Sequence, residues 1–275
     1  TNYNQLIYNE LYSTNGYHMA FESLLNYRFI KRLSIKGIRV KYFINWWENQ
    51  PLDKAYNFAL NKFYKKTETI GYLGYVPREL EMQLSPTKSE LKSNTIPKTI
   101  GIIGAGYVNN IKYISNEINI KVLPALRFNH LWRNDMKHKS NKFLFIALPM
   151  LISESEVIIE MIIQANKINK IELNYCIKTH PTIDKNLFIK KYNFPKNFHF
   201  SDEDTHNLIN NSKVVISGIS SICMESICLG KPTIIIEKDK CLNFDPVPKF
   251  IDNILFKRAN NYKELSKHIK FYLNL

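Results

Sequence analysis

Cysteine is scarce in this sequence of 275 residues. The four cysteines form neither a CxxC pair nor a group with histidines at metal-ligand spacing, which argues against a disulfide scaffold and against a zinc module. We therefore expect reduced, largely buried thiols, as in a cytoplasmic protein. The four are Cys176, Cys223, Cys228 and Cys241.

Long apolar runs are also absent. No run reaches the ~18–20 residues of a membrane span, the N-terminus lacks the apolar core of a signal peptide, and no segment reads as a strongly amphipathic anchor helix. We expect a cytoplasmic protein, with peripheral contact at the inner face of the cytoplasmic membrane left open. Because the sequence begins at Thr1 rather than at a methionine, we also expect that a preceding region has been removed.

Acidic residues are in deficit. The 24 Asp and Glu stand against 38 Lys and Arg, a formal net charge of +14, which favours an anionic partner such as phosphate, nucleic acid or acidic lipid without choosing among them. An AT-rich coding sequence would produce the same excess of lysine. The aromatic residues are not interleaved with Lys and Arg on a recognisable module, so no nucleic-acid partner is expected.

The chain is long enough for two α/β domains. Its first part predicts strands at 39–46, 69–73, 99–103 and 121–126, a helix at 52–65 and a surface connection at 85–98. A charged and polar stretch, 132–142, marks the expected boundary between domains 1–135 and 136–275.

Strands and helices alternate after that stretch. Short apolar strands alternating with helices indicate parallel βαβ units in a doubly wound sheet, whose ligands bind beyond the carboxyl ends of the strands. A capping box, Ser153 with Glu156, is expected to open the first of these helices. The predicted strands are 143–148, 171–177, 198–200, 213–217 and 233–237, and the predicted helices are 153–167, 185–192, 204–210, 221–229 and 262–273.

Two strand ends in the second domain carry candidate binding residues. Lys178, His180 and Pro181 follow the strand at 171–177, where the proline holds the histidine in a loop and an imidazolium can donate a proton or hydrogen bond to a leaving phosphate. The alternative is a loop histidine that makes local hydrogen bonds.

The second strand end leads into a helix. Gly218 permits a tight turn, and the hydroxyls of Ser220 and Ser221 together with the helix N-terminus form a candidate anion cradle. Simple helix capping by either serine is the alternative. Glu225, one turn into the helix, is a candidate acceptor for ribose hydroxyls, against the ordinary interpretation of an exposed helix glutamate.

Glu48 is the candidate catalytic base in the first domain. It follows a strand beside Trp46 and Trp47, and a carboxylate there can take the proton of a sugar hydroxyl while the aromatic faces contact sugar rings. The alternatives are core tryptophans and a Glu48 that caps the following helix.

No cofactor or metal is expected. The glycines at 101, 104 and 106 suggest a dinucleotide fingerprint, but Asn109 stands where the third glycine should be. The acidic run at 202–204 lies at a predicted helix start and is interpreted as capping rather than as a metal-binding DxD.

Taken together, these motifs resemble GT-B glycosyltransferases. The segment from Val214 to Pro232 is similar to their nucleotide-site signature of strand, Ser-Ser, Glu and Gly-Lys-Pro, and an HP motif followed by an SS motif resembles bacterial sialyltransferases and the Kdo transferases of capsule and lipopolysaccharide synthesis. The resemblance implies that His180 meets the donor phosphate or cytidine and that Ser220 and Ser221 bind phosphate.

The first domain adds a weaker resemblance. The WENQ run at 47–50 and the PALR run that ends at Arg127 look like bacterial surface-carbohydrate biosynthesis proteins, so Arg127 is included as a candidate for binding phosphate or an acidic sugar. The Asp/Glu-Asp-Gly motif that supplies the sialyltransferase base is not present, and Glu48 is chosen from its position instead. The opening strands of a GT-B N-terminal domain are also missing, so we expect that domain to be incomplete.

The sequence thus predicts a metal-independent GT-B glycosyltransferase with two Rossmann-type doubly wound domains. The expected partners are a CMP-activated acidic sugar as donor and a surface glycan or lipid-linked glycan as acceptor. A CDP-alditol phosphotransferase of the teichoic-acid type and a non-catalytic nucleotide- or glycan-binding homologue are the alternatives.

Overall fold

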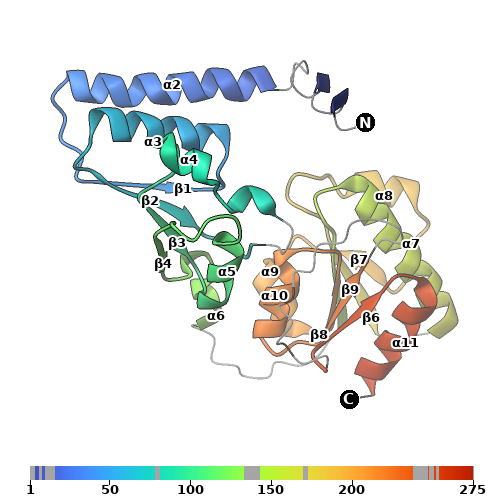
Figure 1. The fold of residues 1–275 in the computed structure, drawn as a ribbon. Coiled ribbons are helices and arrows are strands. Elements are labelled where there is room, and N and C mark those ends of the chain that lie inside the picture. The colour runs from blue at the N-terminus through green and yellow to red at the C-terminus, as the bar shows by residue number, and fades with distance from the viewer. Residues whose placement is uncertain are drawn as a thin grey trace. The chain divides into compact units, whose positions relative to one another are not determined.

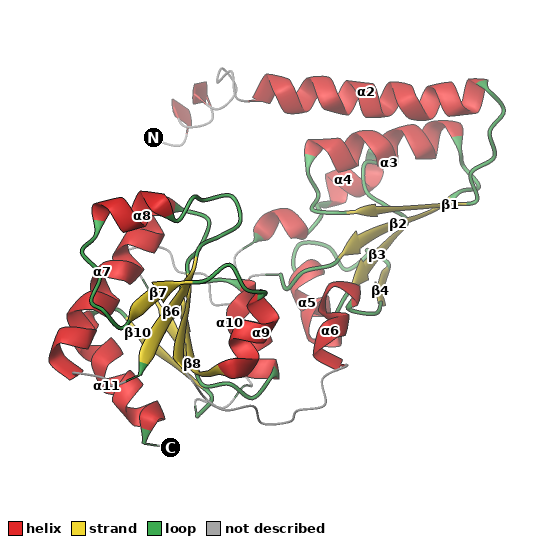
Figure 2. Cartoon of the chain, turned by 180° about the vertical axis from the view of Figure 1, so that it is seen from behind, coloured by secondary structure: helices red, strands yellow, loops and turns green. Residues whose placement is uncertain are grey.

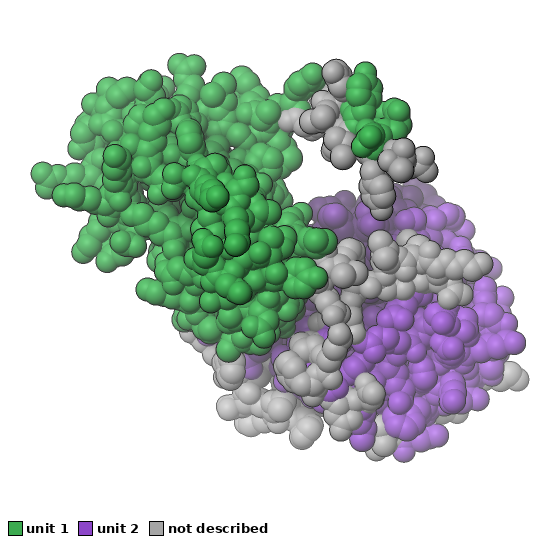
Figure 3. All heavy atoms as spheres, viewed as in Figure 1, with its two compact units in different colours: residues 1–127 green, residues 128–275 purple. Residues whose placement is uncertain are grey.

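The chain forms two compact units, Thr1–Arg127 and Phe128–Leu275, which Figure 3 colours separately. A computed structural model describes residues 4–5, 8–9, 16–77, 81–132, 143–169, 173–237, 247, 251 and 254–274. The predicted domain boundary at 135/136 lies outside the described residues. Each unit is described by itself below (Figure 1).

The first unit is built on a four-stranded parallel sheet with the strand order β1-β2-β3-β4. β1 runs parallel to β2, β2 to β3 and β3 to β4, so their carboxyl ends lie at one edge. The elements are α2 (Gly16–Ile35), β1 (Tyr42–Trp46), α3 (Pro51–Phe63), β2 (Glu68–Leu73), α4 (Lys88–Lys92), β3 (Thr99–Ile102), α5 (Val108–Ile111) and β4 (Ile120–Val122), with 3-10 turns at Met82–Leu84, Ala105–Tyr107 and Leu126–Phe128.

Helix α2 forms an outer layer of this unit. Its Ile30 packs with Ala59 and Leu60 of α3 and is 1% exposed, while α3 itself lies against the sheet (Figures 1 and 2). The strands and the α3 helix of this unit confirm the sequence prediction to within a few residues, whereas α2 was not predicted. The segment 85–98 is not only a surface connection, because it contains α4 and buries Ile96.

The glycines at 104 and 106 follow β3. The helix after them, α5, spans only Val108–Ile111, shorter than the helix of a dinucleotide-binding βαβ unit.

The second unit contains a six-stranded parallel sheet with the order β10-β9-β8-β5-β6-β7. The chain builds β5, β6 and β7 outward in one direction, returns to pair β8 with the other side of β5, and continues outward to β10. Its elements are α6 (Asn129–Trp132), β5 (Phe143–Ala147), α7 (Ile152–Asn169), β6 (Asn174–Lys178), α8 (Asn186–Lys191), β7 (Phe198–Phe200), α9 (Thr205–Asn211), β8 (Ser212–Ser217), α10 (Ser221–Cys228), β9 (Thr233–Ile236), β10 (Phe256–Ala259) and α11 (Tyr262–Leu273).

Helices cover both faces of this sheet (Figure 2). Leu144 and Ile146 of β5 point to the core formed with α7, α8 and α11, and Phe145 and Ala147 point to the core formed with α9. Alternate residues of one strand are therefore buried on opposite faces, which explains why these strands read as continuous apolar runs.

Most elements of this unit confirm the prediction, and α11 and β7 match it residue for residue. The capping box at Ser153 was wrong, because α7 begins at Ile152 and Ser153 lies inside its first turn. Strand β10 was not predicted. Cys176 and Cys223 are buried as expected, Cys228 is exposed, and Cys241 lies outside the described residues.

Candidate functional site

The carboxyl ends of β5 and β8 meet at the point where the second unit reverses its strand order. In open parallel sheets, ligands bind in the crevice outside the strand ends at such a point. The Ser217 hydroxyl, at the end of β8, donates a hydrogen bond of 3.1 Å to the carbonyl of Ala147, at the end of β5. This bond fixes the two strand ends side by side.

The loop from β8 into α10 carries the predicted anion cradle. Ser220 is the N-cap of α10, and its hydroxyl oxygen accepts a hydrogen bond of 3.2 Å from the N–H of Ile222. The capping interpretation is thereby confirmed for Ser220, and Ser221 is the first helical residue. Capping does not exclude a ligand, since a serine hydroxyl that accepts a hydrogen bond still has its own proton to donate, and the first N–H groups of an α-helix have no intrahelical acceptor.

The prediction that Gly218 is needed for a tight turn after β8 is not supported by its backbone conformation. Its φ is outside the left-handed region, so no tight turn depends on it, and an added Cβ would lie 3.4 Å from the Ile158 side chain and 3.8 Å from that of Pro149. Both distances are ordinary van der Waals contacts, so the packing does not require a glycine at this position either. The role of the β5 loop itself was not predicted, because it contains no side chain typical of catalysis.

The His180 ring is held by its own loop. The Thr182 N–H lies 3.3 Å from the ring nitrogen Nδ1 and its hydroxyl lies 2.7 Å from the same atom. Because a backbone N–H can only donate, Nδ1 is the acceptor, and the neutral ring carries its proton on Nε2. Nε2 makes no hydrogen bond to the described residues. His180 therefore makes the local hydrogen bonds expected of an ordinary loop histidine through Nδ1, and it keeps the N–H of Nε2 as a donor for a ligand.

For Lys178 and Pro181 the structure gives contacts or exposure that need no ligand to explain them. The Lys178 ammonium donates to the backbone carbonyl of Glu203, so it connects the loops after β6 and β7. Pro181 is exposed beside His180. Asp204 caps α9 by accepting from the N–H groups of His206 and Asn207, which confirms the capping interpretation of the acidic run.

Glu225 is not the exposed helix residue of the ordinary interpretation. Its side chain is 16% exposed, and its Oε2 lies 3.3 Å from Nε2 of His130. The His130 ring in turn packs edge-on against His206, with 5.0 Å between ring centroids. Burial lowers the pKa of His206, and the neighbouring His130 lowers it further. Sequence reasoning missed both histidines, which lie far from Glu225 along the chain and give no spacing signal.

Glu48 lies in the first unit, at the end of β1. The indole N–H of Trp46 donates to its Oε1 and the side-chain amide of Gln50 donates to its Oε2, each at 2.8 Å. Trp46 is partly exposed and stacks with Tyr75, whereas Trp47 is fully buried in the core. One tryptophan is therefore a surface ring and the other a core residue.

A buried carboxylate shapes the turn that presents Glu48. Asp53 of α3 accepts hydrogen bonds from the backbone N–H groups of Glu48 and Gln50, both at 3.0 Å, and from the Asn45 amide at 2.8 Å. Burial raises the pKa of Asp53, and these hydrogen bonds oppose the rise. Asn49 adopts a left-handed φ of 57° within the same turn, a conformation that asparagine tolerates. The helix cap is thus Asp53 with Gln50, not Glu48.

The remaining candidate, Arg127, is exposed in the 3-10 turn at Leu126–Phe128 and is the last residue of the first unit. The structure therefore places Glu48 and Arg127 in the first unit and the other candidates in the second.

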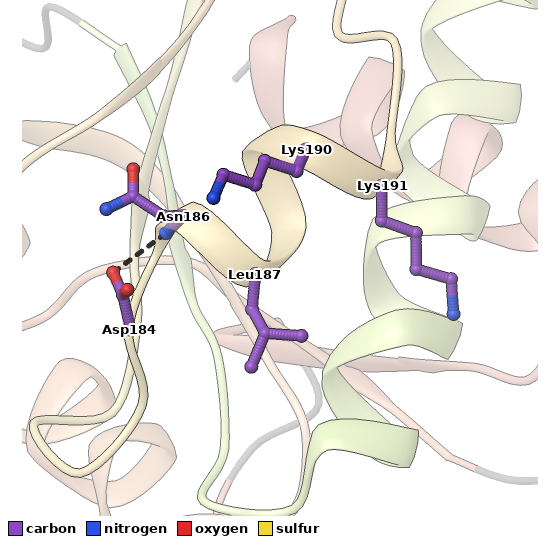
Figure 4. Close-up of a pocket in the computed structure, with 5 residues that line it drawn as sticks. All are labelled: Asp184, Asn186, Leu187, Lys190 and Lys191. Carbon is purple, nitrogen blue, oxygen red and sulfur yellow. Dashed lines mark hydrogen bonds between the residues drawn. The ribbon is translucent and has the colours of Figure 1, made fainter.

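A hollow of about 380 Å³ lies beside α8, and Figure 4 shows its side chains. Its Asp184 accepts a hydrogen bond from the backbone of Asn186, and its Lys191 pairs with Glu156. None of the predicted site residues lines it, so we do not assign the candidate site to it. The lining residues are Asp184, Asn186, Leu187, Lys190 and Lys191.

The comparisons with known proteins find likeness in structure. No family model matches the sequence, and a search of curated proteins gives no significant match. A UDP-GlcNAc 2-epimerase from Methanocaldococcus jannaschii, in complex with UDP-GlcNAc and UDP, superposes with a TM-score of 0.57 at 15% identity, covering 96% of this chain and 76% of that chain.

Two further solved structures are also similar. UGT89C1 from Arabidopsis thaliana, complexed with UDP, gives a TM-score of 0.57 at 10% identity over 91% of this chain and 68% of that one. MurG from Acinetobacter baumannii gives a TM-score of 0.50 at 10% identity over 93% of this chain and 70% of that one.

These neighbours define the class of fold. The chain has the GT-B fold, with two parallel-sheet, Rossmann-like α/β units, as the sequence predicted. Identities of 10–15% establish the fold alone.

The His206 environment yields a test by pH. A histidine whose pKa is lowered by folding binds its proton more weakly in the folded state, so stability is lost as the pH falls below the unfolded value of ~6.5. We expect the melting temperature of His206→Gln to fall less than that of the wild type between pH 7.5 and pH 5. Calorimetric melts at both pH values measure this. An equal fall in both proteins would contradict the assignment.

Proposed function

We propose that this protein is a glycosyltransferase that moves a sugar from a nucleotide-activated donor to a bacterial surface glycan acceptor. The proposal rests on one observation: the order of the strands in the sheet of the second unit reverses between β5 and β8. Open parallel sheets bind ligands outside the strand ends at such a point, and here the loops after β8, β5 and β6 follow three strands that are adjacent in the sheet.

The donor site is proposed at this edge. Adjacent strands are ~4.8 Å apart, so the loops that carry Ser220 and His180 flank β5 at a separation of roughly 10 Å, a span that suits a nucleotide phosphate group. The first turn of α10 supplies N–H groups and a positive dipole end, the two serines supply hydroxyls, and His180 supplies its Nε2 proton. Glu225, whose Oε2 faces His130, is proposed to accept ribose hydroxyls through its other oxygen.

These groups suit departure of a nucleotide. In the transfer step the acceptor oxygen bonds to the anomeric carbon, the bond from that carbon to the phosphate oxygen breaks, and the phosphate leaves with the electron pair. Donors that are fixed in place stabilise the negative charge that develops on it. We propose that Glu48 takes the proton of the acceptor hydroxyl, with the exposed ring of Trp46 contacting the acceptor sugar and Arg127 binding acidic groups.

We propose CMP as the nucleotide and an acidic sugar as the transferred group. The support is the resemblance of the HP and SS motifs to sialyltransferases and Kdo transferases, together with the net charge of +14. The similar epimerase and UGT89C1 structures are complexes with UDP, so UDP is the main competitor in any test.

A second candidate activity is epimerisation of a UDP-sugar at C2. It is favoured by the similarity to the epimerase bound to UDP-GlcNAc and UDP. An epimerase converts its nucleotide sugar without an acceptor, so product formation from the donor alone separates it from a transferase. Product mass separates both from a phosphoalditol transferase.

The Ser220 site gives a sharp test of the donor position. Calorimetric titration with CMP, CDP, UDP and GDP is expected to show selective binding of CMP. Ser220→Asp keeps a capping oxygen, so the stability should change by less than about 0.5 kcal/mol. Its negative charge should nevertheless weaken nucleotide binding at least ~10-fold.

The matched control is Asn261→Asp, which adds the same charge at the N-cap of α11. This helix follows β10, the strand at one edge of the sheet. The control variant should leave the affinity unchanged. Equal affinity in Ser220→Asp and the wild type, or no nucleotide binding by the folded protein, would refute the donor site.

Glu48→Gln tests the base. Glutamine retains an oxygen that accepts from Trp46 but cannot take a proton, so turnover should fall by roughly 10²–10⁴ while the Kd of the nucleotide stays constant. Glu117→Gln, an exposed glutamate of the same unit that lies 3.8 Å from Lys88, is the control. Transfer rates measured with a labelled donor decide the matter, and an unchanged rate in Glu48→Gln would remove Glu48 from the mechanism.

A further inference from the structure

Helix α2 carries a large apolar surface on its outward side. α2 is the outer layer of the first unit, with α3 between it and the sheet (Figures 1 and 2). Its exposed apolar side chains, each between 49% and 74% accessible, are Tyr17, Phe21, Leu24, Leu25, Phe29 and Ile35.

This surface is separate from the side of α2 that packs in the unit. Ile30, with Tyr27 and Leu33 beside it, contacts α3. At 100° per residue, Tyr17, Leu24 and Ile35 project to the opposite side of the helix. A helix needs one apolar stripe to pack against its neighbour, so a second stripe facing outward indicates a partner outside the unit.

Three basic residues lie on the same outward side of α2, and three more follow the end of the helix. Between Glu22 and Glu48 the chain has six basic residues and no acidic one. Leu24 and Arg28 are four residues apart, and Leu24 and Lys31 are seven apart, so basic and apolar side chains alternate along one face. All six are exposed: Arg28, Lys31 and Arg32 lie on α2, and Lys36, Arg39 and Lys41 lie between the end of α2 at Ile35 and β1.

We propose that the outward face of α2 docks this protein on an anionic lipid surface. A helix of 20 residues is ~30 Å long and would lie in the interface plane, with its aromatic and aliphatic side chains at the acyl boundary and its Lys and Arg at the acidic headgroups. Among the described residues no helix is long and apolar enough to cross a membrane. Peripheral docking through α2 needs no such span.

Charge argues against a second copy of the chain as the occupant. Two copies of this face would bring their basic residues together, and like charges across an interface are unfavourable. An acidic lipid surface satisfies the apolar and the basic side chains together. The inference does not depend on the donor site or on the transferase proposal.

The test is co-sedimentation of the whole chain with two kinds of vesicle, phosphatidylcholine alone and phosphatidylcholine mixed with phosphatidylglycerol. We expect binding at least ~10-fold tighter to the mixed vesicles, and weaker binding as salt is raised. Lys31→Gln combined with Arg32→Gln should weaken it about fivefold per residue. Phe21→Gln combined with Leu24→Gln should weaken it at least ~10-fold.

The matched control is Leu187→Gln combined with Ile189→Gln, two exposed apolar residues of α8 in the second unit; it should bind as the wild type does. Both α2 pairs are exposed, and melting curves verify that the variants fold. The proposal is overturned if the α2 variants bind as the wild type does, or if the wild type ignores acidic vesicles. It is also overturned if the α2 variants convert an oligomer to a monomer while no vesicle binding exists. Loss of nucleotide binding, by contrast, would affect only the proposed function.

Discussion

The parallel pairing of β5 with β8 is the constraint on which the second unit depends. Every strand of the sheet is parallel, so successive strands need crossover connections, and all strands end at one edge. Because the chain reverses direction across the sheet at this pair, the loops after β5 and β8 lead to helices on opposite faces. Open parallel sheets bind ligands at such a point, and for this reason the donor site is proposed there.

In the first unit a buried carboxylate fixes the candidate residue Glu48. Asp53 accepts hydrogen bonds from the backbone N–H groups of Glu48 and Gln50, and these bonds hold the turn after β1 in one conformation. Glu48 is then fixed by two donors, one of them the ring N–H of Trp46. A side chain whose hydrogen bonds and backbone are both fixed loses little entropy on binding a ligand, which is the arrangement expected of a preorganised site.

Much of the second unit could be predicted from sequence because its strands are buried on both faces and read as short apolar runs. The N-cap residues Asp204 and Ser220 were also visible, since capping is local. The pairing of Glu225 with His130 was not, because it joins residues 95 apart in sequence. Helix α2 was missed for a different reason: it is apolar on two sides, so its pattern lacks the single polar face by which an amphipathic helix is identified.

We propose that a nucleotide binds at the carboxyl edge of β8, β5 and β6. Hydrogen–deuterium exchange of the whole chain, with and without saturating CMP or UDP, tests this directly. We expect slower exchange in the loops at 148–152, 178–183 and 217–223, with the rest of the chain little changed. Protection confined to the first unit, or nucleotide binding with no protection in these three loops, would contradict it.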